Sequence, residues 1–154
     1  MKHLIPEFDK LKARFPAGFE SSLLLPCIRR IQEDRGYVAD SDIDGLVEYL
    51  KVPRIQVEEV LSYYTQFRRV AIGRWHIETC RNVSCSMCGA ERLMAHLKGK
   101  LGISPGQTTP DGRVTWSTAE CLGSCGTAPV IVLNNKYHES MDIAKLDALL
   151  RGLD

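Results

Sequence analysis

The stretch Cys121-Leu-Gly-Ser-Cys125-Gly-Thr-Ala-Pro-Val130, read together with Cys80-Arg-Asn-Val-Ser-Cys85, is the most informative part of this sequence. Five of the six cysteines lie between residues 80 and 125. Two tight cysteine pairs at this separation are typical of one metal site with four thiolate ligands. The spacing therefore predicts a domain built around such a site in the second half of the chain.

The composition is typical of a globular chain and argues against nucleic-acid binding and membrane insertion. The chain has 154 residues, of which 44% are hydrophobic and 25% charged, with a net charge of +1, which suits one domain or two small ones. The balanced charge shows no basic stripe, so we expect no nucleic-acid binding. We find no signal or transit peptide and no run of about 18 apolar residues, so we expect a cytoplasmic chain without direct membrane insertion. In that compartment clustered cysteines bind metals more often than they form disulfides.

Amphipathic helices are predicted in the first seventy residues, because apolar side chains recur there at helical spacing. Pro26 is expected in the first turn of its helix, Gly36 should end it, Asp40 or Ser41 should cap the next, and Pro53 should separate the second helix from the third. A further short helix is expected from Phe8 to Phe15. The three stripes are Leu24, Cys27, Ile28 and Ile31; Ile43, Leu46, Val47 and Leu50; and Val57, Val60, Leu61 and Tyr64. Cys27 is thus interpreted as a buried apolar residue without chemistry.

The pattern changes near Arg74. Alternation from Trp75 to Thr79 predicts a strand that ends at Cys80. A helix should carry Leu93, Met94, Leu97 and Leu101, followed by a turn region from Gly102 to Gly112 and strands through 114–116 and 130–133. Asn134-Asn135 predicts a hairpin turn into residues 136–138, and a last helix should carry Ile143, Leu146, Leu149 and Leu150. The order β-α-β-β-α is that of a small thioredoxin-like sheet, with both cysteine pairs in loops at one end.

Three interpretations of the cysteines compete. Cys80, Cys85, Cys88 and a distant Cys121 match the plant-type ferredoxin spacing, although the β-α alternation argues against that fold. Cys85-Ser-Met-Cys88 alone matches a thioredoxin-like redox pair at a helix start, but this leaves the other cysteines unexplained. The third set is Cys80, Cys85, Cys121 and Cys125.

The third set of cysteines is part of a resemblance to a known family, and this resemblance extends over essentially the whole chain. The segment 121–130, its distance from Cys80 and Cys85, Gly36-Tyr37, and Tyr63-Tyr64-x-x-Phe67 resemble the NuoE-type subunit of NADH:quinone oxidoreductase (respiratory complex I). Relatives of that subunit occur in NAD-linked hydrogenases and NAD-dependent formate dehydrogenases. The resemblance implies an N-terminal small helical bundle (residues 1–72) that docks onto a partner, followed by a thioredoxin-like ferredoxin domain (residues 73–154).

The resemblance also implies a function. One 2Fe-2S cluster would be held by Cys80, Cys85, Cys121 and Cys125, with Gly123 and Gly126 letting backbone N–H groups point at the sulfurs. The cluster would exchange electrons with the FMN of an NADH-oxidising, NuoF-type partner, in a complex with further iron-sulfur subunits at the cytoplasmic face of the inner membrane. The chain itself has no G-x-G-x-x-G fingerprint, so we expect no NADH site and no catalytic residue of its own.

Some features stay open at this level. Zinc in the same four cysteines, as in a regulatory module with a zinc ribbon, is the alternative of a different class, and the balanced charge disfavours it. Cys88 departs from the family pattern and is interpreted as a spare thiol. The histidines do not offer Rieske-type spacing, and the isomer of Ala128-Pro129 cannot be read from the sequence.

Overall fold

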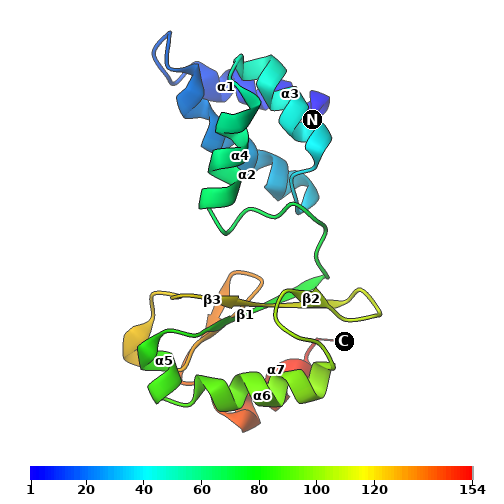
Figure 1. Cartoon of the computed structure of the whole chain (residues 1–154), viewed down its shortest axis with the longest axis vertical. Coiled ribbons are helices and arrows are strands. Elements are labelled where there is room, and N and C mark those ends of the chain that lie inside the picture. The colour runs from blue at the N-terminus through cyan, green and yellow to red at the C-terminus, as the bar shows by residue number, and fades with distance from the viewer. Residues whose placement is uncertain (154) are drawn as a thin grey trace. The chain divides into compact units, whose positions relative to one another are not determined.

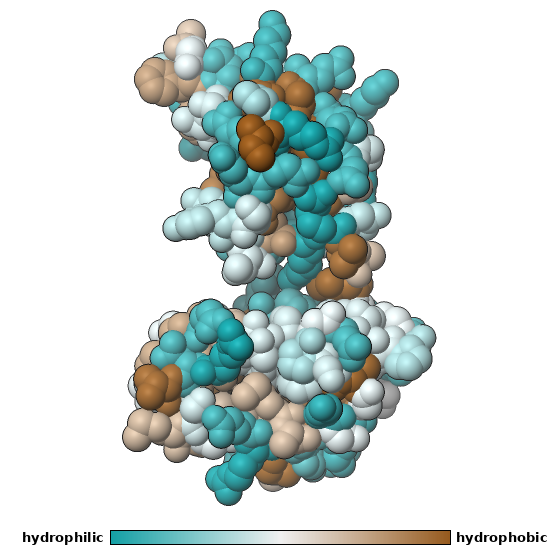
Figure 2. All heavy atoms as spheres, in the orientation of Figure 1, coloured by the Kyte–Doolittle hydropathy of each residue, from teal (hydrophilic) through white to brown (hydrophobic). Residues whose placement is uncertain are grey.

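The computed structural model describes residues 1–153 and separates the chain into two compact units, the first Met1–Ala71 and the second beginning at Ile72. The first unit is helical and the second contains a sheet with helices (Figure 1). Each unit has a hydrophobic core of its own. The visible face of the first unit is mostly hydrophilic, with apolar side chains in small separate groups (Figure 2).

The first unit contains four α-helices: α1 (Ile5–Lys12), α2 (Leu24–Arg35), α3 (Asp40–Leu50) and α4 (Arg54–Tyr63), with 3-10 turns at Lys2–Leu4 and Glu20–Leu23. Most of the predicted apolar stripes form its core, which confirms the helical interpretation. Cys27 is fully buried on α2, as predicted. Its core comprises Leu4, Phe8, Leu23, Leu24, Cys27, Ile28, Ile31, Val38, Ile43, Leu46, Leu50, Val52, Val57, Leu61 and Phe67.

Three boundaries in this unit differ from the prediction. Helix α1 begins at Ile5 rather than Phe8, because Pro6 is accommodated in its first turn. Helix α4 ends at Tyr63, so Tyr64 lies outside it in extended backbone. The prediction that Asp40 or Ser41 caps α3 was wrong: the N-cap is Ala39, whose backbone N–H donates to the carboxylate of Asp42 at 3.0 Å.

Other boundaries in the first unit agree with the sequence. Pro26 lies in the first turn of α2, and Gly36 ends that helix in the left-handed conformation at φ 90°. Pro53 is the N-cap of α4 and separates it from α3. These positions confirm the predicted division of the unit.

The second unit is a five-stranded sheet in the order β2-β3-β1-β4-β5. Its elements are β1 (Trp75–Cys80), α5 (Val83–Met87), α6 (Ala90–Leu101), β2 (Gln107–Thr108), β3 (Val114–Ala119), a 3-10 turn (Cys125–Thr127), β4 (Ile131–Leu133), β5 (Lys136–His138) and α7 (Ile143–Arg151). Helices α6 and α7 cover the same face of the sheet (Figure 1). Their apolar side chains pack with Ile77, Trp116 and Ile131 from the three central strands.

The strand pairing determines where the cysteine loops lie. β1 and β3 are parallel, with Cys80 opposite Ala119, and β4 is antiparallel to β1, with Thr79 opposite Ile131. The carboxyl ends of β1 and β3 therefore lie at the same end of the sheet as the start of β4. Both cysteine loops leave from that end, as predicted.

The sequence missed two elements of this unit. Strand β2 falls inside the predicted turn region and pairs with β3 through only two residues, too few for a visible alternation. The five-residue helix α5 is separate from α6, with Gly89 between them at φ 95°. The predicted hairpin at Asn134-Asn135 is confirmed, since both residues adopt positive φ (46° and 68°). The Ala128–Pro129 peptide bond is cis.

Candidate metal centre

Four cysteines come together at one end of the sheet, each from a different local setting. Cys80 is the last residue of β1, and Cys85 lies within α5. The side chain of Asn82 begins α5 by accepting a hydrogen bond from the N–H of Val83 at 2.9 Å. Cys121 and Cys125 lie in the long connection from β3 to β4. Two loops that are far apart in the sequence therefore meet.

The thiols of the two loops lie near one another. The Sγ atoms of Cys121 and Cys125 lie 4.0 Å apart. The thiols of Cys85 and Cys121 are close enough to Cys80 to lower its pKa, which brings the two loops together. The described residues, 1–153, form no group of three or more His, Cys, Asp or Glu side chains placed to hold a metal ion. Cys80 is adjacent to Cys85 in one loop and to Cys121 in the other, and Cys121 is adjacent to Cys125, so the four thiols lie at one end of the sheet.

Backbone N–H groups point at these sulfurs. Gly123 donates to Sγ of Cys121 at 3.3 Å, and its φ of 77° is a conformation that glycine adopts without strain. The backbone N–H groups of Asn82 and Leu122 act to lower the pKa of Cys80, and that of Val130 acts to lower the pKa of Cys85. Such donors stabilise thiolates and tune the reduction potential of iron-sulfur clusters. The expected role of Gly123 is confirmed, whereas the structure gives no corresponding hydrogen bond for Gly126 among the described residues.

The thiols differ in acidity. Burial alone would raise the pKa of Cys80, but hydrogen bonds from Asn82, Leu122 and the neighbouring thiols outweigh it and lower that pKa. Burial, reinforced by the charge of Cys80, raises the pKa of Cys85 to about 11. The hydrogen bond and charge of Cys121 raise the pKa of Cys125. Cys80 is therefore the member of its pair that ionises first, and thiolate is the form that binds metal.

The site is buried on one side only. Cys80 and Cys85 are each 2% exposed and pack with Ala90 and Val130, whereas Cys121 and Cys125 are exposed. An ion pair between Arg81 and Glu120 joins the two loops next to their cysteines. A group held by these four thiols would be buried on the side of Cys80 and Cys85 and exposed on the side of Cys121 and Cys125.

The remaining cysteines and histidines lie elsewhere. Cys88 is exposed at the C-cap of α5, and Cys27 is buried in the helical unit. Nε2 of His76 is hydrogen-bonded to Ser117 at 2.8 Å, and Nε2 of His96 to Asp147 at 2.8 Å. These contacts agree with packing roles for the two histidines.

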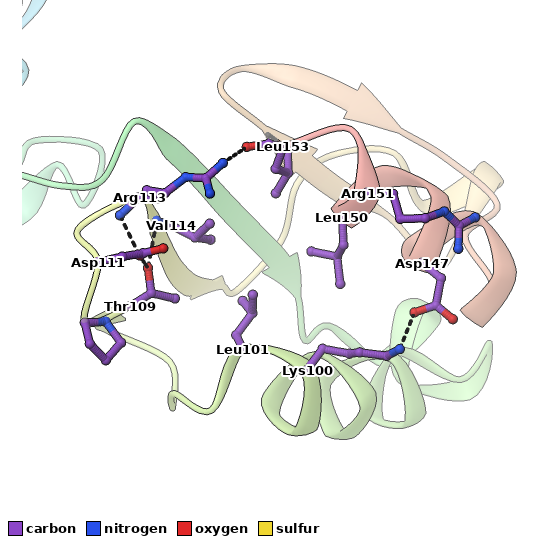
Figure 3. Close-up of a pocket in the computed structure, with 11 residues that line it drawn as sticks. Lys100, Leu101, Thr109, Asp111, Arg113, Val114, Asp147, Leu150, Arg151 and Leu153 are labelled. Carbon is purple, nitrogen blue, oxygen red and sulfur yellow. Dashed lines mark hydrogen bonds and ion pairs between the residues drawn. The ribbon is translucent and has the colours of Figure 1, made fainter.

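A hollow of about 650 Å³ lies at the opposite end of the sheet, where β3 begins (Figure 3). In it Lys100 reaches Asp147 at 3.4 Å, and the guanidinium of Arg113 donates to the carbonyl oxygen of Leu153 at 2.7 Å. Asp111 accepts hydrogen bonds from the hydroxyl of Thr109 and the N–H of Arg113. None of the predicted site residues lines this hollow, so the candidate centre is the thiol cluster.

Comparison with known proteins agrees with this geometry. The family model for the thioredoxin-like [2Fe-2S] ferredoxin matches residues 8–154. The chain belongs to this family. The predicted fold class, a helical segment followed by a thioredoxin-like ferredoxin, is confirmed by this match, and family membership supports a 2Fe-2S cluster as the cofactor.

Relatives by sequence confirm the resemblance to NuoE-type subunits. The chain is 42% identical over 146 residues to the E 2 component of the NADH-quinone oxidoreductase of Rhizobium meliloti (strain 1021), covering 95% of this chain and 86% of the relative. It is 37% identical over 142 residues to NADH-quinone oxidoreductase subunit 2 of Thermus thermophilus, covering 92% of this chain and 78% of that one. The relatives are thus components of an oxidoreductase.

A solved structure supports the fold. A chain of an air-oxidised NAD+-reducing [NiFe]-hydrogenase aligns with a TM-score of 0.73 at 24% identity, covering 85% of this chain but 22% of the hydrogenase chain. In residues 1–153 no helix is both long and apolar enough to cross a membrane.

Proposed function

We propose that this chain is an electron-transfer subunit whose one 2Fe-2S cluster is held by Cys80, Cys85, Cys121 and Cys125. The observation that carries the proposal is the convergence of these four thiols from two loops at one end of the sheet. A 2Fe-2S cluster needs four thiolate ligands and backbone N–H groups that donate hydrogen bonds to the sulfurs.

When bound, such a cluster accepts and releases one electron at a time. The residues of this chain serve that exchange. Cys80 and Cys85 supply buried thiolates, and Val130 and Ala90 exclude water from their side. The N–H groups of Asn82, Leu122 and Gly123 offset negative charge on the sulfurs. Exposed Cys121 and Cys125 leave one side open to an electron donor or acceptor.

The proposed electron partner is the FMN of a NuoF-type, NADH-binding subunit. Support comes from the names of the relatives, which are subunits of NADH-quinone oxidoreductases. The absence of a G-x-G-x-x-G fingerprint in this sequence agrees with NADH oxidation on another chain. The same names favour NADH:quinone oxidoreductase over an NAD-linked hydrogenase or formate dehydrogenase as the parent complex. Further iron-sulfur subunits would belong to that complex.

The helical unit is the proposed docking element, because it supplies none of the four cysteines and still belongs almost entirely to the family match. The domain boundary near residue 72 then separates docking from cluster binding. On this proposal each unit has one task.

The test is the composition and spectrum of the chain purified without oxygen. We expect a brown protein with iron and acid-labile sulfide in equal amounts and an electron paramagnetic resonance signal after one-electron reduction. A colourless protein that contains zinc and no sulfide would instead establish the zinc module.

A further inference from the structure

The carboxylate of Glu139 is bound to the turn that carries Cys125. Its Oε1 accepts hydrogen bonds from the hydroxyl of Thr127 at 2.7 Å and from the hydroxyl of Ser124. Ser124 and Thr127 are the two ends of that turn, and the N–H of Thr127 closes it on the carbonyl oxygen of Ser124 at 3.2 Å. One oxygen atom therefore fastens both ends of a four-residue turn around Cys125.

The backbone next to Glu139 adds to this attachment. The N–H of Ser140 donates to the carbonyl oxygen of Thr127 at 2.7 Å, and that of Met141 donates to Pro129 at 2.9 Å. The segment after β5 thus runs along the connection from β3 to β4. Glu139 is the point at which this segment reaches the cysteine turn through a side chain.

The carboxylate of Glu139 is also charged. Its Oε1 has two lone pairs and accepts from both hydroxyls, a role that needs an acceptor oxygen and not the charge itself. The hydrogen bonds from Ser124 and Thr127 hold the pKa of Glu139 below its ordinary value. A negative charge is therefore present beside the turn at neutral pH.

We propose that Glu139 is a positioning residue that holds the Cys125 turn in place for cluster binding and sets a negative charge next to it. The inference rests on the proposed function. The acceptor role keeps the Cys125 thiolate where the cluster requires it, and the charge disfavours the arrival of an electron, which lowers the reduction potential. Substitution can separate the two roles, because glutamine keeps an acceptor oxygen and loses the charge.

The experiment compares Glu139→Ala, Glu139→Gln and the control Asp111→Asn in the full chain. Asp111 is a matched control: its carboxylate also accepts bonds from a threonine hydroxyl and a backbone N–H, but at the opposite end of the sheet. Two properties are measured, the rate at which a chelator removes iron and the midpoint potential from a spectroscopic redox titration.

We expect Glu139→Ala to lose iron about tenfold faster than the wild type, because the turn loses its acceptor. Glu139→Gln should stay within about threefold of the wild-type rate while raising the ratio of reduced to oxidised cluster about threefold at a fixed potential, about 30 mV for one electron. Asp111→Asn should change neither. Equal release rates in Glu139→Ala and Asp111→Asn would overturn the positioning role, and an unshifted potential in Glu139→Gln would overturn the charge.

The same variants without iron distinguish this inference from the proposed function. In the apo chain we expect faster hydrogen exchange at the N–H groups of Thr127 and Ser140 in Glu139→Ala than in Asp111→Asn. Unchanged hydrogen exchange at these two N–H groups in Glu139→Ala would count against the positioning role. If Glu139→Ala weakens folding as a whole, Glu139→Gln, which keeps the acceptor oxygen, serves as the second variant. A wild-type chain that takes up no iron and sulfide would refute the proposed function and leave the exchange result to decide on the turn.

Discussion

The hydroxyl of Tyr137 donates a hydrogen bond to the carbonyl oxygen of Leu122 at 2.9 Å, so strand β5 is attached to the loop between Cys121 and Cys125. We expect Tyr137→Phe to lower the stability of the second unit by about 0.5–1 kcal/mol, near the lower end for a hydrogen bond, because Tyr137 is half exposed. Urea unfolding followed by tryptophan fluorescence measures this, since both tryptophans lie in that unit. The matched control, Tyr63→Phe at an exposed tyrosine of the helical unit, should leave this transition unchanged; an equal shift in both would contradict the expectation.

Serine substitutions separate the possible ligand sets. If Cys80, Cys85, Cys121 and Cys125 hold the cluster, each Cys→Ser change removes a soft thiolate and should abolish the cluster or alter its spectrum strongly. Cys88→Ser should retain full iron content and the wild-type spectrum. The measurement is iron and sulfide content together with the visible and paramagnetic spectra.

The most decisive member of this series is Cys125→Ser. Cys88 is close enough in sequence to replace Cys85, whereas Cys121, the neighbour of Cys125, is already in use. A normal cluster in Cys125→Ser combined with its loss in Cys88→Ser would establish the plant-type ligand set instead.

Asp42 stabilises the helical unit from a buried position. Its carboxylate is 1% exposed, accepts from the guanidinium of Arg35 at 2.9 Å, and caps α3 through Ala39. Asp42→Ala should lower the free energy of unfolding by about 2–3 kcal/mol, because a buried pair and a cap are lost while Arg35 keeps some access to water. Circular dichroism during thermal unfolding measures this. Asp44→Ala, which breaks only an exposed pair with Arg54, should cost less than about 1 kcal/mol; similar losses would refute the burial argument.

Cys27 predicts a stability loss at alkaline pH. Burial raises the pKa of its thiol to about 12, whereas an unfolded cysteine ionises near pH 8.5. The unfolded state therefore binds fewer protons than the folded state above that pH, so the stabilisation is complete below it and is lost as the pH rises toward 12. Between pH 8 and pH 10 the wild type should lose about 2 kcal/mol more than Cys27→Ala. The cavity in Cys27→Ala lowers the free energy of unfolding by the same amount at both pH values. If urea unfolding shows that the wild type and Cys27→Ala lose equal stability between pH 8 and pH 10, Cys27 is not a buried neutral thiol.

Removal of residues 1–71 tests the docking role of the helical unit. The second unit has its own core and all four candidate ligands, so we expect it to retain the cluster spectrum. Binding to the flavin- and NADH-binding subunit should fall by at least tenfold in a co-purification or titration experiment, because the docking surface is absent. Undiminished affinity would place the interface on the second unit.

Much of the fold is encoded locally. Helices α2, α3 and α4 were predictable because one face of each must be buried, which imposes helical spacing on their apolar residues. The hairpin at Asn134-Asn135 was predictable because both residues tolerate positive φ. The cysteine spacing likewise separated Cys27, on an apolar stripe, from the cluster of five. The residue types and their spacing thus predict the chemical class of the site.

Tertiary structure alone decided the rest. The burial of Asp42 and its ion pair with Arg35 depend on how α2 and α3 meet, which the spacing along the chain does not display. Strand β2 forms only because two of its residues pair with β3. The division of the thiols into buried Cys80 and Cys85 and exposed Cys121 and Cys125 follows from parallel pairing of β1 with β3 and the antiparallel return of β4. The attachment of Glu139 to Ser124 and Thr127 likewise joins segments twelve or more residues apart, because hydrogen bonds between loops depend on where the strands bring them and not on the spacing along the chain.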